Sequence, residues 1–569
     1  MNNARTFLLI AIAACSIMLY QAWMADYGVQ PQQASQVNGE NPAPVGNLEP
    51  TPDAALMPPA AEPGADLPAA PIDPGAVAAP AVASSSAGTV TVTTDVLEVE
   101  LTLEGAGVIG AKLLTYPEEV DTPEQPVILF NDSVGGYYAA QAGYVSANDQ
   151  APDHRAVYRS ASNEYRLSGS QQTLEVPLTW TADNGVVITR TYRFTRGEYL
   201  IEVEDTIVNS SGLAWSAAAY RQLQRVDPFR NDDRGFTQPE KFSFAGAGLY
   251  SDEDKYEKYT FDDLDDEAVN RDIAGGWAAM VQHYFVSAWI PPSAQTNRYT
   301  TQHWDPAGSP RRYIIRQMSP ALTVAAGATS TQNNQLFVGP KLQDRIEDIA
   351  PGLELTVDYG ILTPFSKLLF WGLEKLHALV QNWGFAIILL TIVIKAAFFK
   401  LSEAQYRSIA RMRKVQPRIV ALKERFGEDK QKLNQAMMDL YKTEKINPMG
   451  GCLPVLVQIP VFISLYWVLL ESVELRQAPF MLWIQNLSAP DPYFVLPVIN
   501  GAAMFMSQKL SPNPGMDPMQ QKILMSMPIV FSVMFAFFPA GLVLYWTVNS
   551  VLSLAQQWFI TKRIEAGGK

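Results

Sequence analysis

The chain contains 569 residues, a length that suggests about three or four structural units. It has 43 Lys and Arg against 57 Asp and Glu, and the net charge of -14 argues against a protein that binds nucleic acid over much of its surface. The two cysteines lie in apolar segments, so no disulfide framework is expected. A mean hydropathy of -0.02 averages a polar half with a very apolar half, which excludes an ordinary soluble enzyme and indicates a membrane protein.

The N-terminal segment predicts a membrane anchor followed by a linker. The apolar run Thr6–Trp23 is long enough to cross the hydrocarbon core of a bilayer. Ile12–Cys15 also resembles a lipoprotein cleavage box, but the run stays apolar after the cysteine, which favours an uncleaved anchor over residues 1–24. Residues 25–90 are rich in Pro and Ala, with twelve prolines in 28–90, and are expected to form a disordered exported linker.

From about Thr89 the pattern changes to alternating apolar and polar residues, broken by Gly, Asn and Asp. Runs such as Val186–Thr195 and Leu200–Asn209 show the period of two that is typical of half-buried strands. Repeated runs of this kind predict a large antiparallel β-sandwich over residues 91–345. About 250 residues are ample for a core of its own.

Two features of this region could suggest other chemistry. Gly105–Gly110 matches the dinucleotide-binding pattern G-x-G-x-x-G, but a proline follows within seven residues and leaves no room for the helix, so strand–turn–strand is expected. His154, His283 and His303 lack a second His or Cys at ligand spacing, so structural histidines are expected rather than a metal or acid–base site.

Five further apolar segments follow residue 360, each bounded by polar or Pro- and Gly-rich sequence. They predict transmembrane helices at 383–399, 453–470, 493–508, 523–538 and 540–560. Upstream, 363–381 is expected to form an amphipathic helix at the membrane interface, because charged residues interrupt the run and five apolar residues share one face. These five are Phe365, Leu368, Leu369, Leu373 and Leu376.

The basic residues that flank the apolar segments indicate the orientation of the chain in the membrane. Residues 400–445 hold twelve basic and six acidic side chains, whereas 25–111 hold eleven acidic and no basic ones. The basic loop is therefore expected in the cytoplasm, with the sandwich exported. Together with the anchor this gives six transmembrane helices, both termini in the cytoplasm and a cytoplasmic tail at 561–569.

The basic loop predicts an antiparallel helical hairpin over residues 402–445, with a turn at Gly427 and a kink near Pro417. The outer faces of the hairpin are Lys and Arg, which suit either a solvated determinant of topology or a docking surface for the ribosome or another acidic partner. Each arm carries a narrow apolar seam: Ile409, Met412, Ile419, Leu422 and Phe426 on the first, and Leu433, Met437 and Leu440 on the second.

Polar residues inside the predicted membrane helices concentrate toward the cytoplasmic side. Lys395 lies five residues, or about 7–8 Å, inside Lys400. An ionised lysine at that depth costs free energy, so it either snorkels to the interface or lines a hydrated groove. The candidate groove residues are Thr391, Lys395, Gln458, Asn549, Ser553 and Gln556.

The outer halves of these helices carry almost no polar groups. A channel or transporter for small solutes should have polar lining on both sides of the midplane, so the asymmetry favours a device that takes in a polar segment and passes it over a short apolar barrier. A carbohydrate-active enzyme with a membrane anchor is a second alternative, but no paired carboxylates stand out and one anchor would suffice.

Several long, ordered motifs are highly specific. They include "GGWAAMVQHYFVSAWIP" (Gly275–Pro291), "QNWGFAIILLTIVIK" (Gln381–Lys395), "NPMGGCLPVLVQIPVF" (Asn447–Phe462) and "FPAGLVLYW" (Phe538–Trp546). With these motifs the chain resembles the Oxa-type family of membrane protein insertases, in the form found in Gram-negative bacteria.

The resemblance implies an insertase and chaperone of the inner membrane that uses no ATP, catalytic residue, cofactor or metal. It would work alone or with the Sec translocon (SecYEG and SecDF) on nascent membrane proteins, in contact with the lipid bilayer and with the ribosome bound at the hairpin. The sandwich would be a periplasmic β-supersandwich. Lys395 stands where the family usually has arginine, which keeps the charge but loses the bidentate fork. Tyr545 and Trp546 match the family's substrate-contacting aromatic pair, in which a second tyrosine often replaces the tryptophan.

Overall fold

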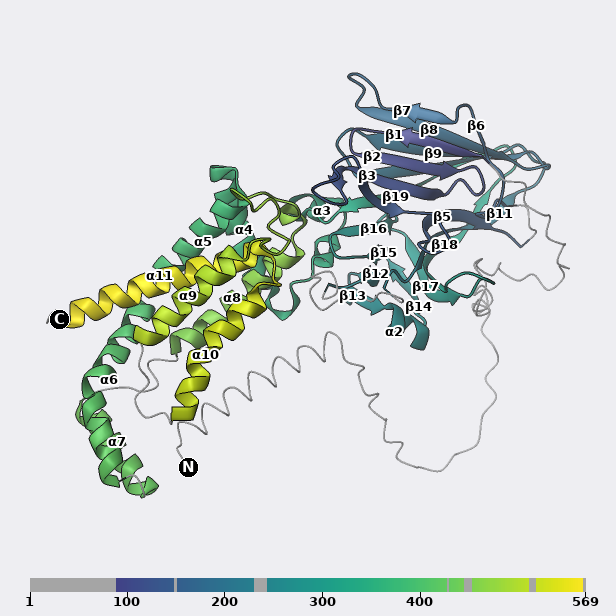
Figure 1. Ribbon diagram of the computed structural model, residues 1–569. Coiled ribbons are helices and arrows are strands. Elements are labelled where there is room, and N and C mark those ends of the chain that lie inside the picture. The colour runs from purple at the N-terminus through teal and green to yellow at the C-terminus, as the bar shows by residue number, and fades with distance from the viewer. Residues whose placement is uncertain are drawn as a thin grey trace, which may run out of the picture. The chain divides into compact units, whose positions relative to one another are not determined.

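The computed structural model describes residues 88–147, 151–229, 243–426, 429–444, 453–510 and 518–565. The predicted anchor at 1–24, nearly all of the predicted linker at 25–90 and the last residues of the predicted tail lie outside these ranges. The described residues fall into two compact units, one ending at Val357 and the other beginning at Asp358. The first is built mainly from strands and the second from helices (Figure 1).

Two large sheets form the first unit. In spatial order the 10-stranded sheet contains β14 (Asn270–Ala274), β17 (Thr296–Trp304), β18 (Arg312–Val324), β11 (Trp215–Val226), β5 (Tyr138–Val145), β3 (Val108–Pro117), β2 (Leu97–Thr102), β1 (Thr89–Thr93) and β7 (Glu164–Arg166), with β4 (Pro126–Phe130) beside β3. The 9-stranded sheet contains β13 (Lys255–Thr260), β12 (Gly246–Ser251), β15 (Trp277–Val281), β16 (Phe285–Ile290), β19 (Thr329–Pro340), β10 (Leu200–Asn209), β9 (Val186–Thr195), β8 (Thr173–Thr181) and β6 (Arg159–Ser160). Short helices α2 (Phe261–Asp266) and α3 (Gln343–Ile349) complete the unit.

The alternation in the sequence places one face of each strand in the space between the sheets. β9 alternates buried and half-buried residues along its whole length and pairs with β10 in antiparallel register. Residues of both sheets meet in one apolar cluster, which contains Tyr144, Val186, Ile188, Ile207, Trp215, Ala217, Ala219 and Val324. The predicted β-sandwich is therefore confirmed, with strands from Thr89 to Pro340.

β11 is the most enclosed strand of the sandwich. It pairs with β5 on one side and β18 on the other. Every one of its residues except Ser216 is buried. Because its neighbours satisfy its backbone and both faces are covered, this strand lies at the centre of the unit.

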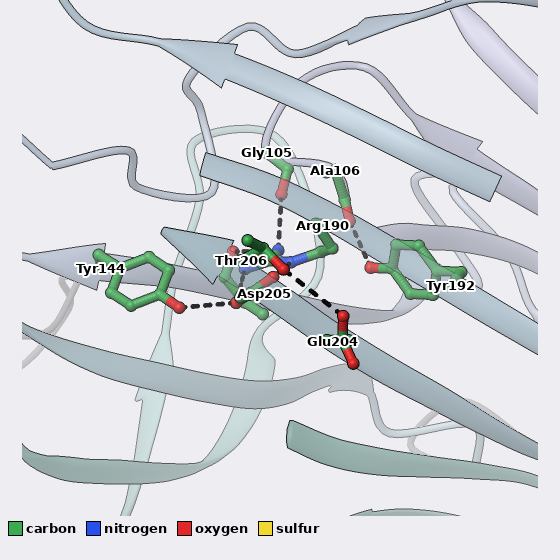
Figure 2. A network of polar contacts seen from close by, with 9 residues as sticks. Gly105, Ala106, Tyr144, Arg190, Tyr192, Glu204, Asp205 and Thr206 are labelled. Atoms are coloured by element: carbon green, nitrogen blue, oxygen red, sulfur yellow. Dashed lines mark hydrogen bonds and ion pairs between the residues drawn. The ribbon is translucent and has the colours of Figure 1, made fainter. Parts of the chain in front are cut away.

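The register of β9 on β10 brings Arg190 opposite Asp205 in the interior (Figure 2). The guanidinium Nε and one terminal nitrogen donate to the two carboxylate oxygens at 2.7 and 3.0 Å, and the Tyr144 hydroxyl donates to the same carboxylate at 2.8 Å. The side chains of the pair are 1% and 2% exposed. Burial alone would raise the pKa of Asp205, but the charge and hydrogen bonds of Arg190 outweigh it and leave that pKa below its usual value.

The turn between β2 and β3 occupies the glycine-rich motif, so strand–turn–strand is confirmed there. Gly105 has φ +77°, and a Cβ at this position would collide with the backbone of His154. The buried His154 imidazole shares a hydrogen bond of 2.6 Å with the Tyr220 hydroxyl, and the buried His283 ring stacks on Tyr284 at 3.7 Å. Within the described ranges no group of three or more His, Cys, Asp or Glu residues could hold a metal ion.

The second unit consists of α4 (Thr363–Val380), α5 (Trp383–Ala397), α6 (Phe399–Phe426), α7 (Lys430–Thr443), α8 (Leu453–Glu471), α9 (Val495–Leu510), α10 (Pro518–Phe535) and α11 (Ala540–Glu565). A helix occupies each segment predicted to be helical after residue 360. The largest differences are at α10, which begins at Pro518 rather than at residue 523, and at α11, which ends at Glu565 rather than at residue 560. Proline suits the first position of a helix because that position needs no N–H donor.

By length and hydropathy, no single helix within the described ranges is sufficient to span a bilayer. One bent pair meets the criteria jointly: Trp383–Ala397 of α5 with Phe399–Ser408 of α6, which turn by 64° at the break between them. Two shorter apolar helical stretches are Gln458–Glu471 and Lys522–Phe535.

Helix α4 is apolar on two sides, so the single apolar face predicted for it is wrong. Leu373, with Phe370 and Ser366, is buried, and the Ser366 hydroxyl donates to the Ser464 carbonyl of α8 at 3.3 Å. The opposite side exposes a second apolar set, which contains Phe365, Leu368, Trp371 and Leu379. The sequence pattern merged these two sets because it does not show which side α8 covers.

Helices α6 and α7 pack as the predicted hairpin, and Pro417 lies within α6. Val415 and Ile419 are buried in its seam, with Met412, Leu440 and Tyr441 packed against them. Met412, Ile419 and Leu440 belong to the predicted seams, whereas Val415 and Tyr441 were not predicted. The Ile409 side chain lies outside the described part of the chain.

Candidate functional site

The Lys395 ammonium lies against helix α11. Its Nζ donates to Ser553 Oγ at 2.7 Å, and that hydroxyl donates in turn to the Asn549 carbonyl at 2.6 Å. Lys395 is half-buried near the end of α5. The α5 lysine is therefore fixed to α11 by a hydrogen bond that joins two distant segments of the sequence.

Asn549 connects this pair to a third helix. The Gln458 amide of α8 donates to Asn549 Oδ1 at 3.0 Å. Lys395, Gln458, Asn549 and Ser553 thus form one hydrogen-bonded group, defined here as the polar cluster, with side chains from α5, α8 and α11. Since each side chain is half-buried, the polar cluster can accept polar groups from outside the protein.

The other two predicted groove residues are not bonded to the polar cluster. Thr391 is 1% exposed, and its hydroxyl donates to the Ile387 carbonyl one turn earlier in α5. Gln556 is half-buried, and its Oε1 has no hydrogen-bond partner among the described residues. Thr391 lies one turn from Lys395 on the same face of α5, so both residues still border the same region.

The sequence pattern missed Gln557, the neighbour of Gln556. Gln557 is 1% exposed and ties α11 to α9, because Ser507 Oγ donates to its Oε1 at 2.7 Å and its Nε2 donates to the Ser507 carbonyl at 3.3 Å. Its position eight residues after Asn549 also fits one helical face. The sequence therefore contained the necessary information, but a helical face assigned from positions i, i+4 and i+7 does not decide which of two adjacent glutamines points to that face.

The two predicted aromatic residues have different environments. Tyr545 is 1% exposed, with its ring centroid 6.3 Å from that of Phe462. Trp546 is half-buried and stacks between Phe462 at 5.0 Å and Phe535 at 4.0 Å. Of the pair, Trp546 is therefore the one that presents an accessible aromatic surface.

Trp546 lines a cavity of about 640 Å³ between α8, α9, α10 and α11. Six aromatic side chains border it: Phe462, Tyr466, Phe531, Phe535, Phe538 and Trp546. Its polar lining includes Asn500, Asn549 and Ser550. We call this cavity the aromatic pocket, and Asn549 belongs both to it and to the polar cluster. Asn500 was not predicted, since one asparagine inside an apolar run gives no helical pattern.

Comparison with known proteins gives a family match for each of the two units. Residues 89–372 match the family model described as the YidC periplasmic domain, and residues 375–567 match the model described as 60Kd inner membrane protein. A protein of Methylococcus capsulatus named membrane protein insertase YidC is 46% identical over 569 residues, covering 99% of each chain. A protein of the same name from Thioalkalivibrio sulfidiphilus is 45% identical over 583 residues, covering 100% of each. A crystal structure of an active YidC insertase aligns with 18% identity and a TM-score of 0.37, covering 83% of this chain and 92% of that one.

Proposed function

Since the chain belongs to the YidC family of membrane protein insertases, we propose that its polar cluster and aromatic pocket are the two halves of the site that handles a client protein. Family membership confirms the resemblance seen in the motifs. The chain is a non-enzymatic insertase of the inner membrane, with its β-sandwich in the periplasm and nascent membrane proteins as its substrates. The transporter, channel and carbohydrate-enzyme alternatives are set aside on this ground.

We propose the six-span topology predicted from the charges, with transmembrane segments at 1–24, 383–399, 453–470, 493–508, 523–538 and 540–560. The periplasmic unit precedes α4, so the N-terminal end of α5 lies on the periplasmic side and Lys395 near the cytoplasmic side. The basic hairpin of α6 and α7 then lies in the cytoplasm, as the positive-inside rule expects. The interfacial helix at 363–381 rests at the periplasmic surface, with Phe365 and Trp371 among its exposed apolar residues.

The bond from Lys395 Nζ to Ser553 Oγ is the observation that carries the proposal for the groove. An ammonium held away from bulk water, among side chains that donate and accept hydrogen bonds, suits the polar flank of a client. The groove comprises Thr391, Lys395, Gln458, Asn549, Ser553 and Gln556. In this mechanism the flank enters from the cytoplasm and rests against these groups.

The apolar segment of the client slides along Trp546 and Tyr545 while its flank occupies the polar cluster. Removing apolar surface from water is worth about 25 cal/mol per Å², so a segment of transmembrane length supplies the free energy for its own transfer. Asn549 borders both regions, which lets flank and segment be held at the same time. No bond is made or broken, and ATP has no role in this step.

We also propose that the protein assists folding as a chaperone and works alone or beside the Sec translocon, SecYEG and SecDF. The cytoplasmic hairpin supports a further contact, with the ribosome. Arg418 and Lys432 are largely exposed on its surface, with side-chain accessibilities of 67% and 70%, and each is paired with one carboxylate, of Glu444 and Asp429 respectively. Such a surface is complementary to ribosomal RNA.

Site-specific photocrosslinking tests the proposed client site. A photoreactive residue at Gln458 should crosslink to the flank of a stalled nascent chain, and one at Trp546 should crosslink to its apolar segment. The exposed Lys367 on α4 is the control position and should give no client adduct. Adducts from Lys367 alone, with none from Gln458 or Trp546, would refute this site.

A further inference from the structure

Asn500 is a buried polar residue of α9, the helix that packs against α11. It is 0% exposed, and neither its Oδ1 nor its Nδ2 has a hydrogen-bond partner among the described residues. Burying an amide without a partner costs free energy, so such a group calls for an explanation.

Polar groups near Asn500 on α9 and α11 are paired on both sides of it. The Thr547 hydroxyl donates to the Val543 carbonyl at 2.7 Å and also approaches the Leu496 carbonyl at 3.2 Å. Two turns further along, Ser507 and Gln557 bond to each other. Thr547 and Ser507 are therefore satisfied before and after Asn500, whereas both polar atoms of the Asn500 amide are left without a partner among the described residues.

Asn500 also lines the aromatic pocket, beside Asn549 and Ser550. The volume of about 640 Å³ falls within the range of ligand pockets, roughly 300–1,000 Å³. No Lys or Arg stands among the described lining residues, which disfavours a phosphate or lipid headgroup as the occupant. Six aromatic rings around the two amides of Asn500 and Asn549 suit the side chains of an apolar helix that contains an occasional polar residue.

We propose that Asn500 is a specificity residue that hydrogen-bonds a polar side chain (Asn, Gln, Ser or Thr) within the apolar segment of a client. This inference rests on the proposed function of the pocket. An amide both donates and accepts, so it can pair with each of these side chains. Asn500 lies five residues into α9, about 7.5 Å from the periplasmic end of the helix, which is the half where the sequence shows almost no polar groups.

Asn500 would therefore assist the insertion mainly of those client segments that contain a polar residue. A polar residue in the client would otherwise cross the outer half of the membrane unpaired, at a cost in free energy. Asn500 would supply a partner there, whereas a wholly apolar segment has no group for it to pair with.

The test uses the full-length protein in proteoliposomes and two single-span clients that differ only in an Asn or a Leu at the centre of the span. Asn500→Leu should slow insertion of the Asn client about threefold to tenfold, the range expected for a hydrogen bond between membrane helices, and leave the Leu client unchanged. Asn500→Ser should restore part of the rate. Asn500→Leu should also raise the unfolding temperature of the insertase, because it removes an unpaired buried amide.

Ser532→Ala is the matched control, since the Ser532 hydroxyl is already paired with the Pro497 carbonyl at 2.8 Å. It should not distinguish the two clients. Equal slowing of both clients by Asn500→Leu would overturn the inference in favour of a packing role, and no slowing of either would also overturn it. Crosslinking from Gln458 and Trp546 is measured in parallel, so loss of the client site itself is seen separately from loss of discrimination by Asn500.

Discussion

Lys395 and Ser553 lie 158 positions apart in the sequence, yet a hydrogen bond of 2.7 Å joins the ammonium of one to the hydroxyl of the other. This bond fixes the position of a positive charge at the junction of α5 and α11. The charge, rather than the identity of the residue, is what a client flank would sense. Substitutions at Lys395 are therefore expected to act through the loss or retention of this charge.

Lys395→Ala should slow insertion most for clients whose translocated flank carries Asp or Glu and least for clients with neutral flanks. Lys395→Arg should be nearly neutral, because charge and reach are kept. The interaction is worth about 1–3 kcal/mol in a partly desolvated site, which is roughly a 5- to 150-fold change in rate. Insertion rates in proteoliposomes, at equal protein levels, measure it.

Lys400→Ala is the control for Lys395, because the Lys400 side chain is 92% exposed and screened by solvent. Lys400→Ala should leave the order of the clients by insertion rate unchanged. If Lys395→Ala slows acidic and neutral clients alike, the electrostatic role is wrong and only a packing or hydration role remains.

The topology can be tested with cysteines at exposed positions, after replacing Cys15 and Cys452 by serine. A cysteine at Ser170 or Ser210 of the sandwich should react with an impermeant thiol reagent from the periplasmic side only. A cysteine at Lys432 of α7 should react only once the inner membrane is opened. Labelling at Lys432 in intact spheroplasts would contradict the six-span arrangement.

Removing the sandwich should spare insertion of small clients. The boundary between the two units at Val357 suggests deletion of Thr89–Val357 with the first span and linker retained. All predicted groove residues lie at or beyond Thr391, so a client with one or two spans should still insert at a rate close to that of the full chain. Quantitative blotting of the helical unit is required, because loss of insertion counts against the prediction only where that unit is folded and abundant.

The buried pair Arg190 and Asp205 should be critical for the sandwich. Asp205→Ala leaves a guanidinium without its partner in the core, at a cost of about 3–5 kcal/mol in the free energy of unfolding. Arg193→Ala breaks exposed pairs with Glu175 and Glu202 and should cost far less, which makes it the matched control. Thermal unfolding of the two variants gives the comparison.

The same pair predicts how stability depends on pH. The folded-state pKa of Asp205 lies below its ordinary value of about 3.9, so its contribution is complete above that value and is lost as pH falls through the folded pKa. The sandwich should therefore lose stability below about pH 4, and Asp205→Asn should flatten that part of the curve. If the stability of Asp205→Asn still falls in the same way below about pH 4, carboxylates other than Asp205 cause that loss.

Patterns local to one segment were predictable from the sequence. The period of two in β9 and β10 depends on each strand alone, and the apolar runs that became α8 and α11 depend on local composition. The polar cluster could also be predicted, because Lys395 and Gln458 stand out as polar residues in apolar segments and because Asn549 and Ser553 share a helical face.

What escaped prediction depends on contacts between segments. Whether Gln556 or Gln557 faces α9 is decided by the rotation of α11 against Ser507, which no single-helix pattern contains. The two apolar sides of α4 were merged for the same reason. Asn500 is the clearest case, since its importance comes from the absence of a partner on α11 within the described residues, and a sequence does not record that.

The pairing inside the polar cluster has a consequence for turnover. At rest, Gln458 is bonded to Asn549 and Lys395 to Ser553, so part of the hydrogen bonding that a client gains replaces bonds that already exist. For a neutral flank such an exchange is worth little net free energy, because a typical intramolecular hydrogen bond contributes only about 0.5–1.5 kcal/mol to begin with. The polar cluster therefore holds a neutral flank weakly, and the dwell time of such a client is set by how readily its apolar segment escapes into lipid. A segment too short to escape falls back into the cytoplasm and leaves the insertase free.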